Sequence, residues 1–428
     1  MRQHRHIPLI ATAIAIAIAT LARPLARAGE LPATGPLPLA DVVAYARAHN
    51  PELEAARWRE AAARAVPAQA AAWDDPTLAA ESWNTPRAVP YDGADNNILK
   101  LSQRLPFPGK LGLRGRMATR DADLAAAEAR MTELAVLEAV KQAYWDLWLA
   151  DRHLAVYTRD LELARELAAG AAGRYAVGTG RQPDVLRAEV ERTHIATRLV
   201  TTRLEREQAA ARLNELLSRG PEEPLGTPID PGPARVPGPL ERLIARARAS
   251  HPDLTGRAAA VEREKDDVAL ARRGYLPDFD LTFERFYNRA GRDGYGAMIA
   301  MTVPLPFKYR RDAALDEAHA RLASEEAMRR RSEDHTVAAV KRALAALQAA
   351  AAERELLAGT HLPQAEQSFA ASREAYVAGN LDFTALVDSL RTIESTHLEH
   401  HEAAAAFEKA YASLETAVGG ELPREERP

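Results

Sequence analysis

The sequence of 428 residues predicts a mainly α-helical fold with a small β part, built twice by internal duplication. It is rich in the helix formers Ala, Leu, Arg and Glu, and only 6% of its residues are aromatic. Apolar residues recur at spacings of three and four through unusually long stretches, as in coiled coils. The segment RYAVGTGRQPDVLRAE at 174–189 also returns as AYVAGNLDFTALVDSL at 375–390, about 201 residues later.

Residues 1–28 have the pattern of a cleaved export signal. Arg2 and Arg5 begin it, an apolar run follows at 7–21, and Ala26, Arg27 and Ala28 form an A-x-A cleavage site. The run is shorter than the ~20 residues that a spanning helix needs. We expect the mature chain to begin near residue 29; the alternative is a membrane anchor that stays in place.

The composition argues against several classes of site. The chain has no cysteine, so disulfides, thiolate metal sites and a lipid anchor on an N-terminal Cys are not expected. The formal net charge of -4 gives no indication of nucleic-acid binding. We find no G-x-S-x-G, phosphate-binding loop or H-E-x-x-H motif. The sequence therefore predicts a protein that is not an enzyme and needs no cofactor.

The duplication sets the predicted domain boundaries. NPEL at 50–53 returns as HPDL at 251–254, and LPF at 105–107 returns at 305–307. We predict a first repeat at 29–220 and a second at 240–420. The Pro- and Gly-rich stretch 221–239 is expected to link them, and residues 421–428 are expected to form a disordered tail.

Each repeat is predicted to contain three helices, of about 32, 65 and 34 residues. In the first repeat they cover 39–71, 113–177 and the residues from the glycine segment to about 217. In the second repeat they cover 240–273, 312–377 and the residues from the glycine segment to about 418. The long helix would measure about 100 Å and the two shorter ones about 50 Å each, so these should stack end to end beside it. Its apolar seam consists of Leu137, Val140, Tyr144, Leu147, Leu154 and Leu161.

In each repeat, two short segments in which apolar and polar residues alternate lie between the first two predicted helices. In 98–105, Leu99, Leu101 and Leu105 alternate with polar residues, and 279–287 alternates in the same way. Weaker strands are expected at 77–84 and 295–303. Their length and alternation suit strands of a transmembrane barrel, but four strands cannot close one, so several chains would share it. The alternative is two hairpins that cap a soluble helical bundle.

The repeated glycine segments are predicted to form the tips of long helix hairpins, because glycine supplies the positive φ that ends a helix. A turn of small residues leaves backbone groups open to another hairpin. The residues that we expect to dock a partner are Gly178, Thr179, Gly180, Gly379 and Asn380. The alternative is an ordinary helix stop.

The chain resembles the outer-membrane efflux protein family, the TolC-like exit ducts, over nearly all of its length after the signal. The resemblance rests on the duplicated plan, NPEL and HPDL, the paired tips, and the exits LSQRLPFPGKLGLR and MTVPLPFKYRRDA. LPFPGK is most similar to the heavy-metal, CzcC- or CusC-like, branch. The resemblance implies a homotrimer, with a 12-stranded β-barrel in the outer membrane of a Gram-negative bacterium and a long α-helical coiled-coil barrel across the periplasm.

The resemblance also implies partners and a passive role. The tips would meet a periplasmic adaptor attached to an inner-membrane efflux pump of the RND type, with metal cations as the transported substrate. Related alternatives are the exit duct of a drug-efflux pump or of a type I secretion system. The alternative of another class is a periplasmic helical scaffold that conducts nothing.

Three copies of the tapering tip would bring rings of like residues toward one axis, where they can form a gate. The gate residues that we expect are Arg181, Asp184, Tyr376 and Asp388. The second copy departs from the family pattern, since Leu381 stands where a basic residue is often found and Ala385 where an acidic one can occur. Gating chemistry is therefore expected mainly in the first copy.

His397, His400 and His401 lie at helical spacing and are the candidates for a metal site. The sequence does not show which groups would orient these histidine rings around a metal ion. We expect a solvated or inter-helix polar cluster rather than a bound metal.

Overall fold

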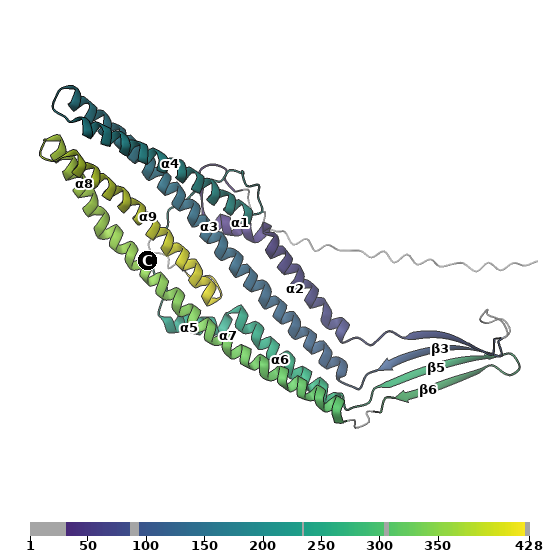
Figure 1. Cartoon of the computed structure of the whole chain (residues 1–428). Helices are drawn as coiled ribbons and strands as arrows, with labels where there is room; N and C mark the ends of the chain where they lie inside the picture. The colour runs from purple at the N-terminus through teal and green to yellow at the C-terminus, as the bar shows by residue number, and fades with distance from the viewer. Residues whose placement is uncertain (1–30, 86–93, 233–234, 304–307, 424–428) are drawn as a thin grey trace, which may run out of the picture.

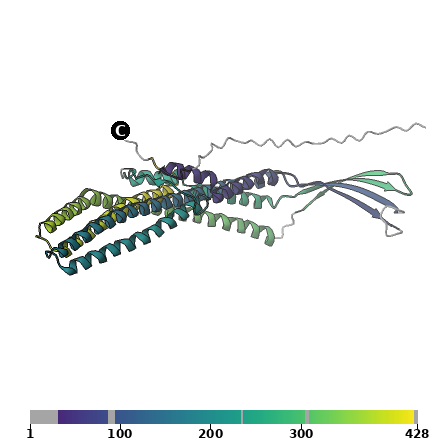
Figure 2. The same ribbon diagram turned by 90° about the horizontal axis from the view of Figure 1, so that it is seen from above.

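A computed structural model describes residues 31–85, 94–232, 235–303 and 308–423 (Figure 1). Long helices run through an elongated molecule, with a four-stranded sheet at one end and two helix hairpins at the other (Figures 1 and 2). The predicted separation of tips and strands is therefore confirmed. The export signal, the second LPF segment at 305–307 and most of the tail lie outside the described residues.

The first predicted helix of each repeat is two helices, so the expectation of one continuous helix is wrong. They are α1 (Leu39–His49) and α2 (Pro51–Ala70), then α5 (Leu240–Ser250) and α6 (Pro252–Arg273). The breaks fall at Asn50 and His251, whose backbones are extended. Each precedes a proline, which disfavours helical geometry in the residue before it.

Asn50 holds the first of these breaks together. Its side-chain oxygen accepts hydrogen bonds from the backbone N–H groups of Glu52 and Leu53, at 2.9 and 3.1 Å. Its Nδ2 donates to the carbonyl oxygen of Leu216, at 2.8 Å. One buried side chain thus caps α2 and joins it to the end of the helix that returns from the first tip.

Asn50→Ala is expected to lower the free energy of unfolding by about 1–3 kcal/mol, because the cap and a buried hydrogen bond are both lost. Asn50→Ser keeps a capping oxygen and loses only the hydrogen bond to Leu216, so it should cost less. Thermal unfolding of the two variants in detergent, followed by circular dichroism, tests this. Equal melting temperatures for the wild type and the alanine variant would contradict it.

The longest helix is confirmed in the first repeat and interrupted in the second. The first repeat has α3 (Lys110–Ala176) and α4 (Gln182–Leu216). The second has α7 (Lys308–Leu356), a π-helical turn at Leu357–His361, α8 (Leu362–Val377) and α9 (Phe383–Val418). Pro363 cannot donate the helical hydrogen bond to Gly359, which accounts for the interruption.

The predicted seam of α3 lies in the core. Its residues are buried except Leu154, which is partly buried, and the neighbouring Trp145 and Trp148 are buried as well. α2 packs along the strand-side half of α3 and α4 along the tip-side half, as their lengths predict (Figure 1).

The strands form one antiparallel sheet in the order β2-β3-β5-β6. They are β2 (Thr77–Trp83), β3 (Asn96–Leu105), β5 (Phe279–Asn288) and β6 (Gly294–Met301). The central pair joins the two repeats, since β3 pairs with β5 along its whole length. The sheet extends beyond the helices at one end of the molecule (Figure 2).

The two faces of the sheet differ in polarity, as the alternation predicts. On one face Lys100 forms ion pairs with Glu81 and Glu284, and Ser102 lies opposite Thr282 with their hydroxyls 3.0 Å apart. The other face is apolar and exposed, and Ile299 is 73% exposed. Its residues include Leu78, Leu99, Leu101, Leu281, Phe283, Ile299 and Met301.

Among the helices of the described ranges, none is both long and apolar enough to cross a membrane.

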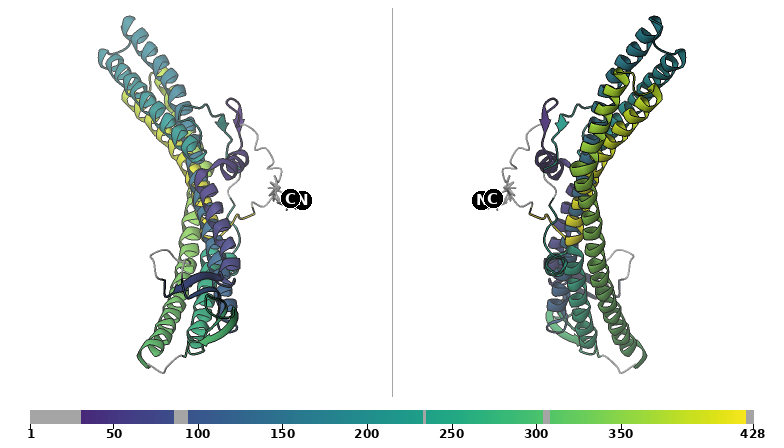
Figure 3. Two further views of the ribbon diagram at one scale, coloured as in Figure 1. Left: turned by 90° about the vertical axis from the view of Figure 1, so that its right-hand side faces the viewer. Right: turned by 90° about the vertical axis from the view of Figure 1, so that its left-hand side faces the viewer.

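The predicted linker packs against the middle of the molecule, which we call the waist. β1 (Pro36–Leu37) pairs in parallel with β4 (Thr227–Pro228) on one side of the bundle (Figure 3). The hydroxyl of Tyr144 donates to the carbonyl oxygen of Leu37 at 2.8 Å and accepts from the N–H of Ile229 at 2.9 Å. Part of the linker is therefore a fixed structural element.

Candidate functional site: the paired tips

The two helix hairpins end side by side at the end of the molecule away from the sheet (Figure 1). The turn between α3 and α4 forms the first tip, and the turn between α8 and α9 forms the second. They share an apolar core in which residues of all four helices meet. This core includes Ala168, Ala188, Phe369, Phe383 and Leu386.

Glycine is required in these turns for two reasons. Gly178 and Gly379 have φ of +78° and +79°, in the left-handed region that favours glycine. A Cβ on Gly180 would lie 2.8 Å from the backbone nitrogen of Tyr175. Most of the residues expected to dock a partner are exposed; Gly180 is half-buried. Their docking role remains a prediction.

Arg174 ties the first tip to the second. Its Nη1 and Nη2 donate to the carbonyl oxygens of Tyr376 and Val377, each at 3.0 Å. Its guanidinium also lies 4.3 Å from the centre of the Tyr376 ring, which meets Phe383 edge to face. The arginine thus donates to carbonyl groups at the C-terminal end of α8, where a positive charge is favoured. The Tyr376 carbonyl also accepts from the backbone N–H of Gly379, at 3.1 Å.

A second connection joins the starts of the two return helices. Nη1 of Arg187 on α4 donates to Oγ1 of Thr384 on α9. Asp382 caps α9, accepting hydrogen bonds from the N–H groups of Thr384 and Ala385. The hydrogen bond from the Thr384 N–H holds the pKa of Asp382 below its ordinary value. Each return helix therefore begins at a defined point relative to the other.

The expected gate residues occupy different environments within one chain. Arg181 is exposed just before α4, and Asp184 is half-buried in its first turn. Tyr376 is half-buried between the tips, whereas Asp388 is exposed on α9. The structure thus brings Tyr376 into the connection made by Arg174. A gating role for all four stays a prediction.

Deeper in the tip half, acidic side chains from three helices gather. Glu191 on α4 is buried and accepts hydrogen bonds from Nε and Nη2 of Arg391 on α9. Asp160 on α3 is 4% exposed, and its Oδ2 has no hydrogen-bond partner among the described residues. Burial raises the pKa of Asp160 to about 6. Burial, together with the charges of Asp160 and Glu191, raises the pKa of Glu394 to about 7.

The three histidines lie on α9 and are partly buried. The rings of His400 and His401 lie 5.4 Å apart, and His401 meets Trp148 edge to face at 5.7 Å. The Nε2 atom of His397 lies 4.0 Å from Oε1 of Glu366. Burial lowers the pKa of all three, that of His401 to about 4. The described residues include no group of three or more His, Cys, Asp and Glu side chains arranged to hold a metal ion.

Sequence reasoning missed the residues that connect the two hairpins: Arg174, Arg187, Thr384, Glu191 and Arg391. One signal was available. Arg174 of the first copy corresponds to Ala375 of the second. The two tips therefore differ in charge at this position, although the segments around it are repeated. The partner of each arginine lies on the other repeat, about 200 residues away, and no local pattern identifies it.

Comparison with known proteins accounts for this architecture. The outer membrane efflux protein family matches the chain twice, at residues 42–219 and 243–420. The chain is 24% identical over 377 residues to the cobalt-zinc-cadmium resistance protein CzcC of Cupriavidus metallidurans, covering 86% of both proteins. It is 29% identical over 289 residues to the protein CyaE of Bordetella pertussis, covering 62% of this chain and 58% of CyaE. The match to CyaE therefore spans little more than half of that protein.

Solved structures share the fold at low sequence identity. CusC superposes with a TM-score of 0.78 at 18% identity, covering 90% of this chain and 92% of CusC. The outer-membrane channel OprN gives 0.76 at 19% identity, covering 90% of each chain. The open state of the MtrE outer membrane channel of Neisseria gonorrhoeae gives 0.74 at 19%, covering 91% of each.

The likeness to CzcC and CusC supports the predicted similarity to the heavy-metal branch. Both repeats are matched over nearly their full length. The chain therefore belongs to the outer membrane efflux protein family, whose TolC-like members are channels and not enzymes.

Proposed function

We propose that this chain is one subunit of a homotrimeric exit duct, which conducts solutes passively through the outer membrane from an inner-membrane pump and a periplasmic adaptor. The observation that carries the proposal is the sheet, which has one apolar exposed face and one polar face, at the end opposite the paired tips. β2 and β6 each have a single neighbour in the described sheet. Three copies would pair these edges and close a twelve-stranded barrel.

Purified protein in planar lipid bilayers provides the test. A duct is expected to give discrete conductance steps, and a helical scaffold none. Because closed tips would limit the current, Asp184→Ala should be measured beside the wild type. No conductance from either protein, or recovery of the chain as a soluble monomer rather than in outer-membrane fractions, would overturn the proposal.

The exposed side of α4 supports the trimer. Leu186, Val190, Val200 and Leu204 are between 53% and 66% exposed and follow heptad spacing on the side of α4 away from α3. In an isolated chain more than half of the surface of each of these residues is exposed. The matching surface of a second chain would bury it, as the apolar seam of a coiled coil is buried.

Val190→Asp is expected to dissociate the trimer, because burying an unpaired carboxylate in this seam costs about 2 kcal/mol or more at each interface. Arg192→Asp, at an exposed position two residues after Val190 and therefore on nearly the opposite side of α4, is the matched control and should leave the trimer intact. Light scattering after size-exclusion chromatography measures the mass. A trimeric Val190→Asp protein would contradict the role given to this stripe.

The transported substrate is proposed to be a divalent metal cation. The support is the likeness over 86% of the chain to a protein named for resistance to cobalt, zinc and cadmium. Deletion of the gene should raise the sensitivity of the host to these metals, and the intact gene should restore resistance. Unchanged metal tolerance with increased sensitivity to drugs, or with loss of a secreted protein, would favour a drug-efflux or type I secretion duct instead.

A further inference from the structure

The two repeats hold the break in their first helix with different side chains. The break falls at Asn50 in the first repeat and, 201 residues later, at His251 in the second; both side chains are buried. Nδ1 of His251 accepts a hydrogen bond from the N–H of Asp253 at 3.3 Å, as the side-chain oxygen of Asn50 does from Glu52 at 2.9 Å. We call these breaks the first joint and the second joint. An amide closes the first joint and an imidazole closes the second.

The end of α9 packs directly against the imidazole (Figure 1). Gly419, which ends α9, has a φ of +89°, and a Cβ there would lie 2.8 Å from Cα and 3.1 Å from Cδ2 of His251. The corresponding residue of the first repeat is Ser218, which has a φ of +57°. The larger ring thus goes with glycine and the smaller amide with serine, so that both joints stay closely packed.

Only a neutral imidazole can cap α6. A ring nitrogen accepts a hydrogen bond through its lone pair, and both nitrogens of the imidazolium ion are donors. Protonated His251 would direct an N–H group at the N–H of Asp253, and it would place a positive charge at the N-terminal end of a helix, where such a charge is unfavourable. The amide of Asn50 does not gain a proton in this range, so the first joint keeps its cap.

The surroundings of His251 favour the neutral ring. Burial lowers its pKa, the charge of Asp253 and a backbone hydrogen bond with Thr416 raise it, and the charge of His335 on α7 lowers it. The net direction is below the ordinary value of 6.5. The cap is therefore present above about pH 6.5, and its contribution to stability is lost as the pH falls below that value.

The carboxylate of Asp253 is shared with other groups. Oγ of Ser332 on α7 donates to its Oδ2, and Nε of Arg257 lies 3.9 Å from its Oδ1. Glu333 on α7 pairs with Arg248 of α5 at 3.0 Å. These acids therefore favour a protonated His251 less than free carboxylates would.

Water has access to the second joint through a cavity of about 280 Å³. Ser250, Pro252, Thr416 and Gly419 are among the residues that line it. The charged side chains in its lining, which come from α1, α3, α9 and the chain after α9, are Arg47, Arg130, Glu133, Glu138, Lys141, Glu415 and Glu421. Each of these carboxylates has a hydrogen-bond or ion-pair partner other than the ring. A proton can thus reach the joint from solvent without a free acid waiting to pair with it.

We propose that His251 makes the second joint acid-sensitive: protonation of its ring removes the cap of α6 and loosens the contact between α6 and the end of α9, while the first joint stays closed. α9 runs from the second tip to this joint, so acid would release one end of a helix that carries a tip. The inference goes beyond conduction and is measured on the purified protein whether or not it conducts.

Backbone hydrogen exchange of the full chain in detergent, followed by mass spectrometry of peptides that cover 252–258, provides the test. Wild type and His251→Asn are compared at the same pH, so that the pH dependence of the exchange chemistry cancels. The ratio of their exchange rates, wild type over variant, should rise about fivefold or more between pH 8 and pH 5. Fivefold corresponds to about 1 kcal/mol, the size of one helix cap.

Two further variants assign the effect. Asn50→His combined with Ser218→Gly should give peptides that cover 52–58 the same acid response, which the wild type lacks there. His335→Asn changes an exposed histidine of α7 near the joint and should keep the wild-type response at 252–258. A rate ratio that does not change with pH, or an acid response that disappears in His335→Asn, would overturn the proposal. If His251→Asn is unfolded by circular dichroism at pH 8, absence of the response in the double variant overturns it instead.

Discussion

Arg174→Ala should increase the conductance of the reconstituted channel by about tenfold or more. The substitution removes both charge-assisted hydrogen bonds to the end of α8 and the contact with the Tyr376 ring. Such a loss is worth about 1.5–3 kcal/mol, and each 1.4 kcal/mol changes an equilibrium about tenfold. The second hairpin would then separate more readily from the first, and the aperture formed by the tips of three chains would widen.

The controls separate the connection from general damage to the helix. Arg174→Lys keeps the charge but loses the planar fork that reaches two carbonyl groups, so its conductance should be intermediate. Arg165→Ala removes an exposed arginine of α3 that forms an ion pair with Glu162 of the same helix, and it should behave as wild type. If Arg174→Ala remains trimeric and conducts like the wild type, the connection between the tips does not limit opening.

Glu394→Gln should make the free energy of unfolding markedly less dependent on pH. The raised pKa of Glu394 means that the folded protein binds this proton more tightly than the unfolded chain does. The resulting stabilisation is complete below the ordinary Glu pKa and is lost as pH rises through about 7. We expect the wild type to lose about 2 kcal/mol between pH 5 and pH 8 from this group, allowing for its partial exposure.

The glutamine variant carries no charge and should therefore be more stable than the wild type at pH 8, while differing little at pH 5. Denaturant unfolding at both values, followed by circular dichroism, measures the difference. Glu399→Gln, on an exposed position of the same helix, is the control and should keep the wild-type pH dependence. A wild-type pH dependence in Glu394→Gln would show that Asp160, or another group, is responsible.

Local patterns in the sequence predicted most of the secondary structure. The alternation in 98–105 identified β3 and its polar and apolar faces, because the period of two holds for any strand with different surroundings on its two sides. The seam from Leu137 to Leu161 identified α3 by the same kind of argument. The breaks at Asn50 and His251 could have been predicted, because each residue precedes a proline, which disfavours helical geometry there. The continuous amphipathic pattern led instead to the expectation of one helix.

The candidate site was predictable only in part. The glycine turns could be located because a positive φ at Gly178 and Gly379 is a property of the residue itself. The bond from Arg174 to Tyr376 could not, since it depends on how two hairpins from different repeats lie beside each other. The same holds for Glu191 and Arg391, and for the carboxyl groups of Asp160 and Glu394 that burial brings together.

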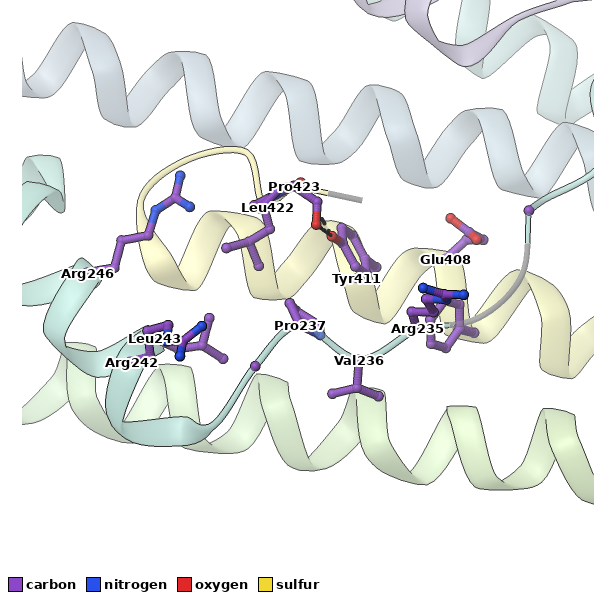
Figure 4. A pocket seen from close by; sticks show the side chains of 13 residues that line it. Arg235, Val236, Pro237, Arg242, Leu243, Arg246, Glu408, Tyr411, Leu422 and Pro423 are labelled. Atoms are coloured by element: carbon purple, nitrogen blue, oxygen red, sulfur yellow. Dashed lines mark hydrogen bonds between the residues drawn. The ribbon is translucent and has the colours of Figure 1, made fainter. Parts of the chain in front are cut away.

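The sequence by itself determined the duplicated plan, the long helices, the amphipathic strands and the glycine turns, because each depends on spacing along one segment of chain. The tertiary structure alone decided which arginines connect the tips, where the linker packs, and that a cavity of about 290 Å³ opens in the waist of the second repeat (Figure 4). These features depend on distances between residues far apart in the sequence, and such distances are set only when the two repeats pack together.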